Sequence, residues 1–153
     1  MVDRLVVNPA GELRAASGSW WWAYNGRRNA DRGVQGYLGH WLVPVKTRRP
    51  DDFWQLVADA TWSGRLGPYS KTDAFPPVPG HPLLVHVYTA DYRDAADLRR
   101  VLNGLRTVGF DGELGYFENE AAHLHLGGPL YTALAGSLRL VRHRDPVRTS
   151  EER

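Results

Sequence analysis

The chain has 153 residues, of which 42% are hydrophobic and 24% charged, and its formal net charge at pH 7 is +2. These values fit one globular domain with its own core, and the small net charge argues against a dedicated binder of duplex DNA. The chain has no cysteine, which excludes disulfides, thiolate metal sites and cysteine nucleophiles. Without an apolar run of the ~20 residues that a membrane span needs, and without a secretory core at the start, we expect a cytoplasmic protein with no membrane contact.

The pattern of apolar residues and turn signals predicts a series of short strands. A loosely ordered lead-in is expected over residues 1–18, a single domain over 19–142, and a charged, disordered tail over 143–153. Pro44 places its strand at a sheet edge or a bulge, whereas Leu83–Thr89 is almost continuously apolar and therefore central. The strands are expected over residues 19–24, 37–46, 66–72, 83–89, 113–117, 122–126 and 137–142.

Two helices are predicted between these strands. The first begins at Pro50 with Asp51 or Asp52 as its cap, buries a stripe that includes Trp54, and ends at Gly64. The second follows a cap at Asp94, carries an apolar stripe, and ends at Gly109; the stripe consists of Leu98, Val101, Leu102, Leu105 and Val108. A strand–helix–strand unit used twice predicts an α+β fold, in which a mostly antiparallel sheet carries two helices on one face.

Several stretches of the middle of the chain resemble one family. They are Gly39–Val45, Trp54, and residues 61–71, 87–94 and 115–127. Over roughly residues 37–127 the chain is similar to the basophilic leukaemia expressed protein family, whose domain is classed with the cap-binding translation initiation factor fold. The resemblance implies a curved antiparallel sheet backed by helices and no established activity, although some members are labelled phosphothreonine-lyase-like. The Trp20–Trp22 run and the proline-rich loop over residues 73–82 depart from the family pattern.

Tryptophans and cations alternate along the chain, which is typical of a site for a phosphorylated ligand. Bases stack on exposed indole rings while Arg or Lys holds the phosphates. The alternative is core packing, which we expect for Trp54 and which is equally open for Trp41. Because side chains alternate along a strand, at least one of Trp20–Trp22 points away from its neighbours. The expected ligand-binding residues are Trp21, Trp41, Lys46, Arg48, Arg49, Arg65 and Tyr69.

A second set of residues fits elimination of phosphate from phosphothreonine or phosphoserine. Such a lyase needs a base for the α-proton, an acid for the leaving phosphate and cations around the phosphate. Lys71 would be the base, with His86, His123 or His125 as the acid. The alternative for Lys71 is a solvated lysine at a strand end.

His123 and His125 share a face of their predicted strand, but no third ligand lies at a recognisable spacing. We therefore predict no metal site. The common phosphate-loop, dinucleotide, serine-hydrolase and zinc-protease motifs are absent, so no cofactor is predicted.

The leading hypothesis is a small binding domain for a phosphorylated small molecule or nucleotide, an RNA end, or a phosphopeptide. The lyase and a protein–protein interaction module are the alternatives. Whether the chain is an enzyme stays open at this point.

Overall fold

The structure is a computed structural model. It describes residues 5–7, 12–15, 20–27, 32–34, 36–46, 50–73, 83–118 and 127–147. The elements in these ranges are β1 (Leu5–Val7), β2 (Glu12–Ala15), β3 (Trp20–Tyr24), β4 (Gly39–Val45), α1 (Pro50–Trp62), β5 (Tyr69–Asp73), β6 (Leu83–Thr89), α2 (Ala95–Val108), β7 (Leu114–Phe117), β8 (Tyr131–Ala133) and β9 (Val141–Arg142).

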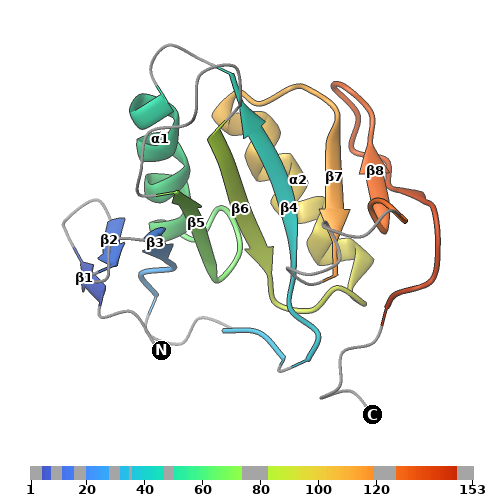
Figure 1. Ribbon diagram of the computed structural model, residues 1–153, viewed down its shortest axis with the longest axis horizontal. Helices are drawn as coiled ribbons and strands as arrows, with labels where there is room; N and C mark the ends of the chain where they lie inside the picture. Colours follow the sequence, from blue (N-terminus) through green and yellow to red (C-terminus); the bar gives the residue numbers. More distant parts are fainter. Residues whose placement is uncertain are drawn as a thin grey trace.

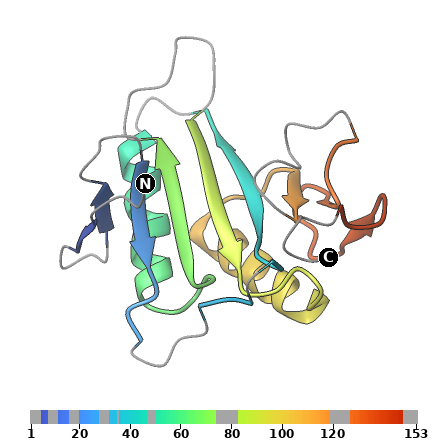
Figure 2. The same ribbon diagram turned by 60° about the horizontal axis from the view of Figure 1, so that its bottom comes forward.

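The nine strands of the described ranges form one open sheet in the order β1-β2-β3-β5-β6-β4-β7-β8-β9, and every neighbouring pair is antiparallel. Both helices pack against the same face of this sheet, α1 near β3 and β5 and α2 near β6 (Figures 1 and 2). The predicted α+β fold, with an antiparallel sheet and two helices on one face, is confirmed.

The centre of the sheet comes from two interleaved strand–helix–strand units. The first unit is β4-α1-β5 and the second is β6-α2-β7. β4 and β6 pair along seven residues at the centre, and each also pairs with the second strand of the other unit. The predicted central position of Leu83–Thr89 is confirmed. β7 pairs with β4 only as far as Leu42, so Pro44 lies where β4 has a single described neighbour.

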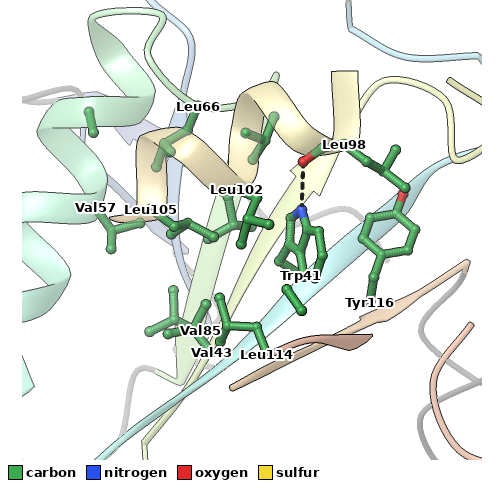
Figure 3. Close-up of a cluster of buried hydrophobic side chains, with 14 of the residues drawn as sticks. Trp41, Val43, Val57, Leu66, Val85, Leu98, Leu102, Leu105, Leu114 and Tyr116 are labelled. Atoms are coloured by element: carbon green, nitrogen blue, oxygen red, sulfur yellow. Dashed lines mark hydrogen bonds between the residues drawn. The ribbon is translucent and has the colours of Figure 1, made fainter. Parts of the chain in front are cut away.

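The core fills the space between the sheet and the helices. Trp41 of β4 is completely buried, and its indole N–H donates to the carbonyl oxygen of Leu98 in α2 at 3.1 Å (Figure 3). Tyr116 of β7 stands edge-on to this indole, with 5.2 Å between the ring centroids. The valines of β4 and β6 and the leucines of α2 complete the layer, and Trp54 joins it from α1, as expected.

The helix ends follow the predicted signals at three of four positions. Asp94 caps α2 by accepting a hydrogen bond from the backbone N–H of Asp97, and Gly109 ends it with φ +116°. Gly64, with φ +84°, follows the end of α1. The fourth expectation is wrong: α1 already begins at Pro50, so Asp51 and Asp52 lie in its first turn and neither occupies the cap position.

Two other expectations need correction. Residues 5–7 and 12–15 of the expected lead-in form β1 and β2, because β3 offers β2 a neighbouring strand edge and β2 in turn pairs with β1. Of the strand expected over residues 137–142, only Val141–Arg142 is a strand, and it pairs with the unexpected strand β8. The strand expected over residues 122–126 and most of the proline-rich loop lie outside the described residues.

The first part of the expected disordered tail is fixed by an ion pair. Arg144 pairs with the carboxylate of Glu118, which is fully buried at the end of β7 and also accepts the backbone N–H of Val147 at 2.7 Å. Arg144 donates further to the carbonyl oxygen of Gly128. Burial alone raises the pKa of Glu118, but the hydrogen bonds from Arg144 and Val147 outweigh it and hold that pKa below its ordinary value of 4.5.

We expect Trp41→Phe to lower the free energy of unfolding by about 2–4 kcal/mol, because the change opens a cavity and leaves the carbonyl of Leu98 without its donor. Urea denaturation followed by circular dichroism measures the loss. Trp62→Phe is the matched control, since that indole is 38% exposed on α1, and it should change stability by less than about 1 kcal/mol. Equal losses in both variants would contradict the assigned role of Trp41.

The Glu118 ion pair predicts a pH dependence of stability. Because its pKa is lower in the folded chain, the unfolded chain binds more protons, and the contribution of Glu118 is present above pH 4.5 and lost as the pH falls through the folded-state pKa. Glu118→Gln should therefore destabilise the chain by about 1–3 kcal/mol at neutral pH and flatten the acid limb of the stability curve. Asp145→Asn, at an exposed carboxylate, should leave both unchanged. An acid limb as steep in Glu118→Gln as in the unaltered chain would refute this.

Candidate functional site

Strand alternation separates the side chains of the sheet into two sets. Ser70 of β5 faces the helices, because its hydroxyl lies 2.9 Å from that of Thr61 in α1, and Trp41 of β4 faces them through its bond to α2. The neighbours of these residues in each strand point to the opposite face, which we call the distal face. Tyr69, Lys71 and His40 therefore lie on the distal face.

Cross-strand pairing brings aromatic and basic residues of four strands together there. Lys71 lies directly opposite Trp22 of β3 on one side and opposite His86 of β6 on the other. Tyr24, Tyr69, Tyr88 and His40 form the adjacent row. Tyr24 is opposite Tyr69 and Tyr88 is opposite His40, while the ring centroids of Tyr69 and Tyr88 are 5.5 Å apart. We call these seven residues the distal cluster: Trp22, Tyr24, His40, Tyr69, Lys71, His86 and Tyr88.

Lys71 is the charged centre of the distal cluster. Its ammonium lies 5.3 Å from the ring centroid of Trp22 and 6.0 Å from that of Tyr88, so both rings contribute cation–π attraction. Only 4% of this residue is exposed. Lysine is rarely buried to this degree, because removing an ammonium from water is costly. The sheet thus holds a cation where an apolar residue is usual.

The two histidines of the distal cluster, His40 and His86, lie side by side. The rings of His40 and His86 are 4.8 Å apart, and His40 also contacts the rings of Tyr88 and Phe117. His86 is 3% exposed and His40 is fully buried. In the described ranges, no group of three or more His, Cys, Asp or Glu side chains is placed to hold a metal ion.

The distal cluster is most accessible on its β3 side. Trp22, Tyr24 and Tyr69 are half-buried, and Tyr69 contacts both other rings edge-on. The hydroxyl of Tyr69 donates to the backbone carbonyl of Arg32 at 2.7 Å, which positions the exposed Arg32 guanidinium 5.7 Å from the Tyr24 ring. Burial raises the pKa of Tyr24, and the charge of Arg32 opposes that shift in part. The phenol of Tyr24 is therefore neutral at physiological pH.

Neither of the two tryptophans that were expected to bind a ligand, Trp21 and Trp41, belongs to the distal cluster. Trp41 is buried in the core, and a completely buried indole has no free ring face for stacking, so we leave it out of the site. Trp21 lies opposite Thr72 and packs against the core on the helix face. Its neighbour Trp22 takes the place beside Lys71.

Four of the remaining expected residues fall into two groups. Lys46 is exposed just after β4, and Arg65 lies on the helix side, where its guanidinium donates to Ser63 and its carbonyl packs against Gly104 of α2. Tyr69 and Lys71 belong to the distal cluster. Outside the described residues lie Arg48, Arg49, His123 and His125.

Sequence reasoning misses Trp22, Tyr24, His40, Tyr88 and Arg32 as site residues. The available signal is the alternation of Trp20–Trp22, which predicts that neighbouring indoles take opposite faces without saying which faces these are. The register of β3 against β5 supplies the answer, and it depends on contacts far apart in the sequence.

A cleft is present elsewhere in the described part of the chain. It is a cleft of about 630 Å³ beside the start of α2, where Asp91, Asp94 and Asp97 lie with Arg27 and Arg100. Two of the carboxylates are paired, Asp91 with Arg93 and Asp97 with Arg100, and Asp94 caps α2. The three carboxylates in this cleft thus already make structural interactions. We therefore place the candidate site at the distal cluster.

Comparison with known proteins agrees with the resemblance seen in the sequence. No helix in the described ranges is both long and apolar enough to cross a membrane. No curated protein matches the chain. The sequence profile of the basophilic leukemia-expressed protein Bles03 family matches residues 29–115, more than half of the chain, a range that contains Lys71, His86 and Tyr88 and begins after Trp22. The chain therefore belongs to the basophilic leukemia-expressed protein Bles03 family.

Proposed function

We propose that this chain binds a phosphorylated ligand at the distal cluster, with Lys71 as the phosphate-binding cation. The observation that carries the proposal is the nearly buried Lys71, whose ammonium lies beside two aromatic rings and which is directly opposite His86. A charge held in surroundings of low dielectric attracts an anion more strongly than the same charge in water. The aromatic rings beside Lys71 also favour a ligand in which the anionic group is attached to a planar, apolar group.

The neighbours of Lys71 supply the other functions of such a site. The rings of Trp22, Tyr24 and Tyr69 are half-buried and offer apolar surface beside the cation. Tyr24 carries a neutral phenol that can donate a hydrogen bond to a phosphate oxygen. Arg32 adds an exposed guanidinium at the rim, held in place through its backbone by Tyr69. The ligand is therefore expected to approach over β3 and to meet Lys71 last.

We expect Lys71→Met to weaken binding of a phosphorylated ligand by about tenfold or more, because it removes the charge and keeps the length of the side chain. The measurement is quenching of tryptophan fluorescence with AMP and a phosphothreonine peptide as probes. Lys71→Arg should retain most of the affinity. Arg139→Met, at an exposed cation between β8 and β9, removes the same charge and should have no effect.

If Lys71→Met fails to fold, His86→Gln tests the same site through the residue opposite Lys71, and circular dichroism identifies a variant that is unfolded. Undiminished quenching in folded Lys71→Met would overturn the proposed function. The proposed function would also be overturned if neither AMP nor the phosphothreonine peptide quenched the fluorescence of the unaltered chain.

A second candidate is the elimination of phosphate from a phosphothreonine peptide. The observation that favours it is the direct pairing of Lys71 and His86 across β5 and β6. This step requires Lys71 as the neutral amine and His86 as the protonated imidazole. The amine of Lys71 would take up the α-proton, the Cβ–O bond would break as a Cα=Cβ double bond forms, and His86 would give its proton to the leaving phosphate. Each side chain has one step, and atoms and charge balance.

The elimination predicts that a phosphothreonine peptide loses the mass of phosphoric acid when incubated with the chain and releases inorganic phosphate in equal amount. Lys71→Ala should abolish the loss, whereas Arg139→Met should not change its rate. A phosphothreonine peptide that is bound at the distal cluster but keeps its mass would leave a binding site and exclude the lyase.

A further inference from the structure

We infer that the ligand of the distal cluster is a single-stranded nucleic acid, bound through at least two consecutive nucleotides. The inference rests on the proposed function and names the ligand class of the same site. It comes from a repeat in the structure: two aromatic rings follow each other along β3, and a different cation lies within 6 Å of each ring centroid.

The two rings are Trp22 and Tyr24. They point to the same face of β3, their ring centroids are 6.4 Å apart and their planes differ by 12°. The ammonium of Lys71 lies 5.3 Å from the first ring, and the guanidinium of Arg32 lies 5.7 Å from the second. One ring with one cation is thus repeated once along the strand.

This repeat matches the repeat of a polynucleotide. In single strands, each nucleotide supplies one planar base and one phosphate, and proteins bind such strands by stacking bases on aromatic side chains while cations follow the backbone. A mononucleotide would occupy one ring and one cation and leave the other pair unused. The second pair therefore favours a ligand of two or more nucleotides.

A phosphopeptide fits the same surface less well. Phosphopeptide sites place several arginines around one phosphate, whereas the described residues here place Lys71 beside Trp22 and Arg32 beside Tyr24. A phosphorylated side chain also brings no second planar group for the Tyr24 ring. Duplex nucleic acid is disfavoured because its bases are stacked on each other and the net charge of the chain is only +2.

The anchoring of Arg32 supports a function for the second pair. Its carbonyl accepts the hydroxyl hydrogen bond of Tyr69, a member of the distal cluster, while its guanidinium remains exposed. The site itself thus fixes the backbone of this cation. Arg93 provides a comparison, because its guanidinium lies 3.4 Å from the Tyr37 ring but is paired with Asp91.

The experiment compares AMP with the 5′-phosphorylated dinucleotide pApA by quenching of tryptophan fluorescence. The unaltered chain should bind pApA about tenfold or more tightly than AMP, because the dinucleotide adds a second stacked base. Arg32→Gln and Tyr24→Leu should each lower the affinity for pApA by about fivefold and change the affinity for AMP by less than about twofold. Arg93→Gln alters an arginine that lies over the ring of Tyr37. This control should leave the affinities for AMP and pApA unchanged.

Salt dependence gives an independent readout. For a single strand, the logarithm of the affinity falls with the logarithm of the salt concentration with a slope of about −0.7 for each phosphate neutralised. We expect the affinity for pApA to fall more steeply with salt than the affinity for AMP, and the slope for pApA to be shallower in Arg32→Gln than in the unaltered chain.

Equal affinity for AMP and pApA, or an unchanged pApA affinity in Arg32→Gln, would overturn the inference and leave the proposed function standing. Tighter binding of a phosphothreonine peptide than of pApA would also overturn it. If Lys71→Met changes the affinity for none of the phosphorylated probes, the proposed function itself fails. The two failures are therefore distinguishable.

Discussion

The register of β4 against β6 is the constraint on which the rest of the structure depends. Trp41 lies opposite Val87 and His40 opposite Tyr88, so one row faces the helices and the next row faces away. A shift of one residue would exchange the two faces along the whole strand. For β4 it would expose Trp41 and the valines and turn His40 towards the helices. The bond from the Trp41 indole to Leu98 selects one register, because only in that register does the indole reach the helix.

The interleaved order of the two strand–helix–strand units explains why the candidate site draws on both. Lys71 and Tyr69 come from the second strand of the first unit, whereas His86 and Tyr88 come from the first strand of the second unit. Because β5 pairs with β6 and not with β4, the side chains that surround Lys71 belong to segments far apart in the sequence. The first unit alone would lack the ring of Tyr88 beside the ammonium of Lys71. The distal cluster is therefore a product of the sheet order, and the sheet order in turn depends on the central pair β4 and β6.

The sequence predicts local features well and the faces of strands poorly. The caps at Asp94 and Gly109 and the stripe of α2 are confirmed, since each depends on residues within a few positions of each other. By contrast, the alternation of Trp20–Trp22 shows that Trp21 and Trp22 take opposite faces but not which of them meets Lys71. Only the pairing of β3 with β5 decides this. Short strands such as β1 and β2 escape prediction for the same reason, because β2 pairs with β3 and β1 pairs with β2.

The range of the family match separates the two parts of the proposed site. Lys71, His86 and Tyr88 lie within residues 29–115, so the cation and its immediate neighbours belong to the region that this chain has in common with the family profile. Trp22 and Tyr24 precede that range, on a strand that joins the sheet at β5. Under the proposed function, affinity for an anion would then reside in the central strands, whereas preference for a particular planar group would reside in β3. A sheet that grows by adding strands at its edge can change the second property without disturbing the first, because β3 contributes rings to the site but takes no part in the central pairing of β4 with β6.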